Sequence, residues 1–107
     1  MVIEDRVTTR PSRQPVHPGA FLRRNILPAL EAKGVTMVGF ASALGITRQS
    51  LYAVLNAERA VTPDMAVRLG RCLGNAPQFW LNMQANHDVW TAEHKPDVRK
   101  VVRLVMA

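Results

Sequence analysis

The stretch that decides the fold runs from Thr36 to Asn56 and reads TMVGFASALGITRQSLYAVLN. Thr36 and Thr47 are good helix N-caps, and Gly45 stands where a helix must end in a left-handed residue, which glycine adopts at little cost. Apolar residues recur at helical spacing in each half, as Phe40, Ala41 and Leu44 and then as Leu51, Val54 and Leu55. The pattern predicts two short helices joined by a tight glycine turn.

The two helices must stabilise each other, because isolated helices shorter than about 12–15 residues are marginal in water. The small Ala41 allows them to approach closely, and Ile46 fills the core after the turn. This is the helix-turn-helix arrangement, in which the second helix presents its outer face and its N-terminus to a DNA major groove.

The outer face of the second helix carries side chains suited to DNA. Arginine pairs with guanine and glutamine with adenine at the major-groove edge, and helix N-termini favour phosphate oxygens. We therefore predict base contacts from Arg48, Gln49, Ser50 and Tyr52, and phosphate contacts from Thr36, Thr47, Asn56 and Arg59. Two alternatives stay open: the start of this helix is a solvated surface without a partner, or Tyr52 packs against the protein.

Helices are also predicted on both sides of this motif. The first begins around His17 and Pro18 and ends at Gly34, with a kink or break near Leu27 because Pro28 lies inside it. After the motif, a helix capped by Thr62 stops at Gly74.

A last helix opens near Pro77 and ends at Lys95 and Pro96. Its apolar face, which marks core packing or an interface with a second copy or a partner, consists of Phe79, Trp80, Met83, His87 and Trp90. We therefore expect a flexible basic arm over residues 1–16, an all-α domain over 17–94, and a tail over 95–107. The valines of the tail suit a helix or a strand.

Composition narrows the classes of partner. The chain has 107 residues and a net charge of +6, from 14 basic and 8 acidic residues, which favours a polyanionic partner. No apolar run approaches the ~20 residues that a membrane-spanning helix needs, and the polar N-terminus has no secretory signal. A single cysteine, Cys72, excludes an internal disulfide, and its place in a helical pattern predicts burial. We expect a cytoplasmic protein.

Catalytic and metal-binding patterns are absent from the sequence. His17, His87 and His94 share no metal-ligand spacing, and no glycine-rich phosphate loop occurs. Ser42 and Ser50 have no base at a useful spacing. The sequence therefore predicts neither an enzyme nor a metal or cofactor site.

Several runs of residues together resemble HigA-type antitoxins of the xenobiotic-response-element (XRE) group of helix-turn-helix proteins. The matching runs are His17-Pro18-Gly19, Leu44-Gly45-Ile46-Thr47-Arg48-Gln49, Val61-Thr62-Pro63-Asp64-Met65-Ala66, Arg68-Leu69, and Phe79-Trp80-Leu81-Asn82-Met83-Gln84 with Asp88 and Trp90. The resemblance spans roughly residues 16–94. It implies a five-helix, lambda-repressor-like domain that forms a homodimer, binds the palindromic operator of its own operon, and neutralises a RelE-like mRNA endonuclease toxin.

The chain departs from this family at three positions. Met37 stands where many such proteins carry a glutamine that touches phosphate, Ala20 replaces a commonly acidic residue, and His87 replaces a frequent tyrosine. Our leading hypothesis is an antitoxin that represses its own operon. The alternatives are a free-standing repressor and a toxin-binding module without DNA binding, and Met37 favours the latter.

Overall fold

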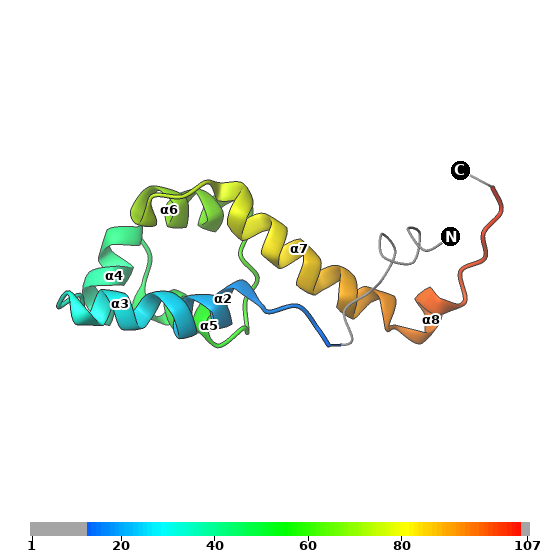
Figure 1. Ribbon diagram of the computed structural model, residues 1–107, viewed down its shortest axis with the longest axis horizontal. Helices are drawn as coiled ribbons and strands as arrows, with labels where there is room; N and C mark the ends of the chain where they lie inside the picture. The colour runs from blue at the N-terminus through cyan, green and yellow to red at the C-terminus, as the bar shows by residue number, and fades with distance from the viewer. Residues whose placement is uncertain (1–12, 106–107) are drawn as a thin grey trace, which may run out of the picture.

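In the computed structural model, which describes residues 13–105, this part of the chain is helical and contains no strand. The elements follow the labels of Figure 1: α2 Pro18–Phe21, the π-helical segment η1 Leu22–Ile26, α3 Leu27–Ala32, α4 Met37–Leu44, α5 Arg48–Leu55, α6 Pro63–Leu73, α7 Pro77–Glu93 and α8 Pro96–Arg99. α2, η1 and α3 form one continuous helical rod, α6 lies on the opposite side of the domain, and α7 leads away from both (Figure 1). The predicted all-α fold is confirmed.

The predicted helix boundaries depend on local caps, and the structure contains these caps. The hydroxyl oxygen of Thr36 accepts a hydrogen bond from Gly39 N, and that of Thr47 accepts one from Ser50 N, each at 3.0 Å. Gly45 ends α4 and Gly74 ends α6 in left-handed conformations, with φ of 74° and 83°. Each boundary is therefore set by residues within one turn of it.

The interruption expected near Pro28 takes the form of a π-helical segment. Leu27 N donates to Leu22 O, five residues back, and α3 then begins with Pro28 in its first turn. Proline lacks the N–H that an uninterrupted α-helix would need at this point, and a π turn changes the hydrogen-bond register before it. The rod consequently continues past the proline without a break in the helical path.

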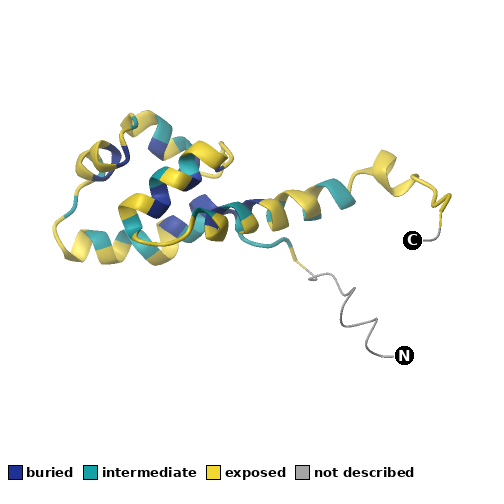
Figure 2. Ribbon diagram, turned by 90° about the horizontal axis from the view of Figure 1, so that it is seen from above, coloured by how far each residue is buried: buried dark blue, intermediate teal, exposed yellow. Residues whose placement is uncertain are grey.

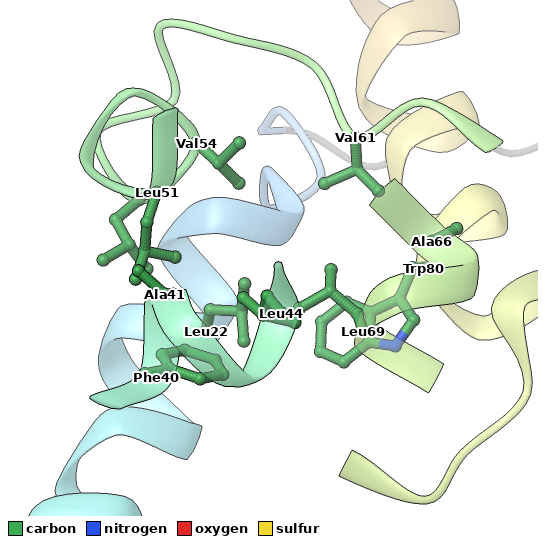
Figure 3. Packing of buried hydrophobic residues seen from close by; sticks show 11 residues of the cluster. Leu22, Phe40, Ala41, Leu44, Leu51, Val54, Val61, Ala66, Leu69 and Trp80 are labelled. Atoms are coloured by element: carbon green, nitrogen blue, oxygen red, sulfur yellow. The ribbon is translucent and has the colours of Figure 1, made fainter. Parts of the chain in front are cut away.

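The core lies where α4, α5, α6 and the start of α7 meet η1 (Figure 3). Its largest member, Trp80, is fully buried, and its indole Nε1 donates to Asn75 Oδ1 at 2.8 Å. The other buried hydrophobic residues are Leu22, Phe40, Ala41, Leu44, Leu51, Val54, Leu55, Val61, Ala66 and Leu69. Cys72 does not join them, because it lies on the exposed side of α6, so the burial expected for it is wrong.

The rod and α5 touch at a glycine. A Cβ on Gly19 would lie 1.7 Å from the carbonyl oxygen of Val54, a distance that no side chain can occupy. Glycine at this position therefore lets α2 pack directly against the backbone of α5. The contact fixes where α5 lies relative to the first helix.

A short N-terminal strap, residues 14–16, lies along α7. The ring of His87 donates through Nδ1 to Pro15 O at 2.8 Å, and its Nε2 lies 3.3 Å from Gln14 Nε2, which also reaches the hydroxyl of Thr91. These residues are half-buried, so packing against α7 includes residues before position 17, where the sequence places the start of the domain. The rest of the predicted arm, residues 1–12, lies outside the described residues.

The strap ends at His17, which is buried and caps α2. Its Nδ1 accepts from Gly19 N at 2.9 Å, and its ring meets that of His87 edge to face at 5.0 Å between centroids. Burial, reinforced by charge repulsion between the two neighbouring rings of His17 and His87, lowers the pKa of His17 from its ordinary value of 6.5, although Asp88 opposes the shift. The folded chain therefore favours the neutral ring, which keeps a lone pair on Nδ1 for the cap.

The far end of α7 and everything after it lie outside this core. Figure 2 shows mostly exposed residues along the second half of α7 and on α8. The tail predicted as helix or strand forms the single turn α8 and then no regular structure over residues 101–104, with Val101 and Val102 more than 70% exposed. Within residues 13–105, no helix combines the length and apolar character needed to cross a membrane.

The lowered pKa of His17 makes the stability of the domain depend on pH. Because the unfolded chain binds this proton more readily than the folded one, the free energy of unfolding falls as the pH drops below 6.5. Replacement His17→Asn keeps an N-cap acceptor but removes the titrating ring, so we expect a smaller loss of stability between pH 8 and pH 5.5. Urea unfolding at several pH values measures the difference.

His94→Asn is the matched control, since His94 is exposed beyond the last turn of α7. It should retain the pH dependence of the wild type. Equal pH dependence in His17→Asn and wild type would contradict the assignment of this effect to His17.

Candidate nucleic-acid interface

The four predicted base-contacting residues lie within the first five residues of α5. We call them the recognition surface: Arg48, Gln49, Ser50 and Tyr52. Arg48 and Gln49 are exposed, Ser50 is half-buried, and the Tyr52 side chain is 42% exposed. The opposite side of α5 carries Leu51, Val54 and Leu55 into the core, so the recognition surface faces away from the protein body.

Ser50 has a defined hydrogen-bonding role. Its hydroxyl oxygen accepts from the Thr47 hydroxyl at 3.0 Å and from Arg59 Nη1 at 3.2 Å. With both acceptor positions occupied, the hydroxyl proton of Ser50 remains to be donated. The geometry thus prepares Ser50 to donate to a base acceptor or a phosphate oxygen.

The predicted phosphate-contacting residues occupy the borders of this surface. Thr36 and Thr47 are exposed at the N-termini of α4 and α5, where they also serve as caps. Arg59 follows α5 in sequence, and its guanidinium reaches back to Ser50. Asn56 ends α5, and its Oδ1 accepts from Arg23 Nη2 at 2.6 Å.

Met37, the departure noted in the sequence, is half-buried and packs against the hydrophobic core. A methionine at this position supplies packing in place of the polar contact that glutamine makes in the family it resembles. The first turn of α4 thus keeps its Thr36 cap and lacks one polar side chain.

Sequence reasoning missed Arg68, which holds the turn between α4 and α5. Its Nη1 donates to the carbonyl oxygens of Leu44 at 2.9 Å and Gly45 at 3.2 Å, and its Nε donates to Asp64 Oδ2 at 2.7 Å. A Cβ at Gly45 would lie 2.9 Å from Nη1. Arg68 therefore ties α6 to the corner of the helix-turn-helix. The spacing of Asp64 and Arg68, four residues apart on one helix, was the available signal.

The predicted interface residues of α7 are not equivalent. Trp80 has no exposed surface, so of the two alternatives for this face an interface is wrong for Trp80 and core packing is right: the ring fills the core of a single protomer. Phe79, next to it, is 42% exposed and contacts Phe21 edge to face at 5.6 Å. Met83 and Trp90 are half-buried, and His87 holds the strap, so for these residues the interface stays a prediction.

Within the described part of the chain, no three His, Cys, Asp or Glu side chains gather as metal ligands would. The arrangement is instead one of hydrogen-bond donors on the exposed side of a short helix. Such a surface can bind a polyanion through direct contacts alone.

Comparison with known proteins shows which family has this arrangement of helices. A helix-turn-helix family model matches residues 29–80, which include α4, α5 and α6. Antitoxin HigA-1 of Vibrio cholerae is 34% identical over 83 residues, which cover 78% of this chain and 75% of that protein.

Two solved structures extend the match to the fold. Antitoxin GraA in complex with its operator superimposes with a TM-score of 0.75 and 34% identity, over 91% of this chain and 98% of that one. The Pseudomonas aeruginosa antitoxin HigA with the higBA promoter gives a TM-score of 0.71 and 28% identity, over 86% and 100% of the two chains. Together with the glycine-cornered pair α4 and α5, these similarities show that the chain belongs to the HigA-type family of helix-turn-helix antitoxins.

Proposed function

We propose that this protein is an antitoxin that binds the operator of its own operon through α5 and represses transcription. The single observation that carries the proposal is the outward-facing recognition surface on a helix whose other side is locked into the core. The operator-bound GraA structure, which shares the fold, supports the same mode of binding. The protein has no enzymatic activity of its own in this proposal and acts in the cytoplasm.

Each group on the surface has a part in the proposed complex. Arg48 bridges the O6 and N7 acceptors of a guanine, and Gln49 pairs with N6 and N7 of an adenine. Tyr52 adds an apolar contact further along the groove. The N-termini of α4 and α5, at Thr36 and Thr47, direct backbone N–H groups toward phosphates and so fix the register of the helix on the duplex.

The remaining parts of the proposal concern other proteins. A homodimer with two-fold symmetry places its two recognition helices about one DNA turn apart, ~34 Å. A RelE-like mRNA endonuclease is the toxin that the family assignment implies. Its gene should be an adjacent reading frame that encodes a small basic protein. A chain with no such neighbour would instead be a free-standing repressor.

The second candidate function is a toxin-binding module that does not bind DNA. One observation favours it: Met37 packs into the core where the family commonly carries a glutamine that touches phosphate. The exposed side chains of Arg48 and Gln49 at the start of α5 argue against it, because they suit base contacts that a module without DNA binding would not make. Mobility shift with the DNA upstream of the gene separates the two candidates.

Replacing Arg48 and Gln49 together by alanine should abolish the preference for the operator. Each good bidentate contact is worth about 1–3 kcal/mol of discrimination, so losing two, at least about 2 kcal/mol, lowers operator affinity by about 30-fold or more. Both side chains are exposed, so the fold should stay intact. Operator and unrelated duplexes titrated at one fixed salt concentration measure the change.

The control is Arg71→Ala with Gln78→Ala, which removes the same two residue types from exposed positions on α6 and α7. α6 lies on the other side of the domain from α5 (Figure 1). This control should bind the operator like the wild type. Wild-type operator affinity in the Arg48 and Gln49 variant would refute base reading by α5.

Arg68→Ala tests the brace at the turn, by which we mean the hydrogen bonds from Arg68 to the carbonyl oxygens of Leu44 and Gly45. Without the guanidinium, the corner between α4 and α5 loosens and α5 meets the groove less accurately, so we expect operator affinity to fall about fivefold, or roughly 1 kcal/mol. Arg68 acts as a positioning residue, so the slope of log affinity against log salt concentration should stay that of the wild type.

Arg71→Ala, on the same helix, removes an equal charge from an exposed side chain and should leave both quantities unchanged. Unchanged affinity of Arg68→Ala would show that the brace is dispensable. A shallower salt slope would show that Arg68 contacts phosphate itself.

A further inference from the structure

Two arginines of the first helix lie beside the C-terminal end of α5. Arg23 and Arg24 belong to η1, whose first residue, Leu22, is buried, while both arginines are exposed. They line a hollow between the rod and α5, together with Ala20, Leu55, Asn56 and Ala57. No carboxylate is among these lining residues, so no acidic side chain of the hollow neutralises the two positive charges.

The polar groups of the hollow are arranged as hydrogen-bond donors. Because a guanidinium can only donate, the atom of Asn56 that faces Arg23 Nη2 at 2.6 Å is the amide oxygen. This contact uses the acceptor of the side chain and leaves the Nδ2 donors of Asn56 for another group. Arg23 donates one of its five N–H groups to Asn56, and Arg24, which also lines the hollow, adds further donors. Such a set of donors suits an anion.

The position of the hollow suggests which anion binds there. α5 has eight residues, which at 1.5 Å per residue span about 12 Å, close to the width of the major groove. When a helix of this length lies across the groove, its N-terminus is near one phosphate wall and its C-terminus is near the other. Thr47 lies at the first end, whereas Asn56, Arg23 and Arg24 lie at the second.

We propose that Arg23 and Arg24, with Asn56, bind the phosphodiester backbone of the duplex on the wall opposite the one that Thr36 and Thr47 contact. The inference rests on the proposed function and extends the DNA-binding surface from the helix-turn-helix onto the first helix. Asn56 donates to a phosphate oxygen while Arg23 holds its amide in place, and Arg24 adds a second charge. The contact holds the C-terminal end of α5 in the groove and carries no sequence information.

Salt dependence tests this inference directly. Each arginine that contacts a phosphate releases counterions, so Arg24→Ala should lower the slope of log affinity against log salt by about 1, and Arg23→Ala with Arg24→Ala by about 2. Affinity for operator and for an unrelated duplex should fall by the same factor, roughly tenfold for each arginine, so the ratio between the two duplexes stays constant. Substitution of both residues by lysine should restore most of the slope.

The matched control is Arg99→Ala with Lys100→Ala, which removes two charges from α8 and the residue after it, at the opposite end of the molecule from α3 (Figure 1). The control should keep the wild-type slope. Thermal unfolding of each variant identifies any change that comes from loss of the fold, and the lysine variant, which keeps both charges, separates loss of charge from truncation of the side chain.

Three results would overturn the inference. In the first, the Arg23 and Arg24 variants bind DNA with the slope of the control. In the second, they keep wild-type DNA binding but lose binding to the neighbouring toxin, so that the hollow holds an acidic segment of a protein. In the third, the wild-type chain fails to bind its operator, which contradicts the proposed function as well, whereas the first two leave it standing.

Discussion

An eight-residue helix cannot keep its shape alone in water, and the proposed function rests on one such helix, α5. The protein holds it at several points. Leu51, Val54 and Leu55 bury its inner side, and the missing side chain of Gly19 lets α2 press against its backbone. Arg68 ties the turn before it, and Arg23 contacts Asn56 at its end. On the outer side, the side chains of Arg48 and Gln49 stay exposed.

The buried side of α5 stabilises the helix, and polar side chains on its other side are therefore available for a ligand. A rigid helix presents donors at fixed positions, so binding a duplex costs little ordering of the protein. The hydrogen bonds among Thr47, Ser50 and Arg59 add to this by fixing the direction in which Ser50 donates. The hydrogen bonds made by the Thr47 cap and by Arg68 lie within the protein, whereas the side chains of Arg48 and Gln49 stay exposed.

Features encoded within one turn of the chain were predictable from sequence. The caps at Thr36 and Thr47 and the left-handed Gly45 are such features, and together with the apolar spacing they sufficed to place α4, α5 and the exposed side of α5. Contacts between residues far apart in sequence were not predictable. Arg68 reaches Leu44, Arg23 reaches Asn56, and His87 reaches Pro15, because packing of the core brings these elements together. The position of Trp80 was not predictable for the same reason. Helical spacing shows that one side of a helix packs against apolar residues, but not whether those residues belong to the same protomer or to a partner.

In the proposed complex, the exposed side of α5 is the surface that a duplex meets. Titration of the isotopically labelled protein with its operator, followed by nuclear magnetic resonance, tests this most directly. We expect the largest changes in amide signals from Thr47 to Tyr52, with a second group around Arg23 and Asn56, and little change along α6. Changes concentrated on α6 or the far half of α7, with α5 unaffected, would contradict it.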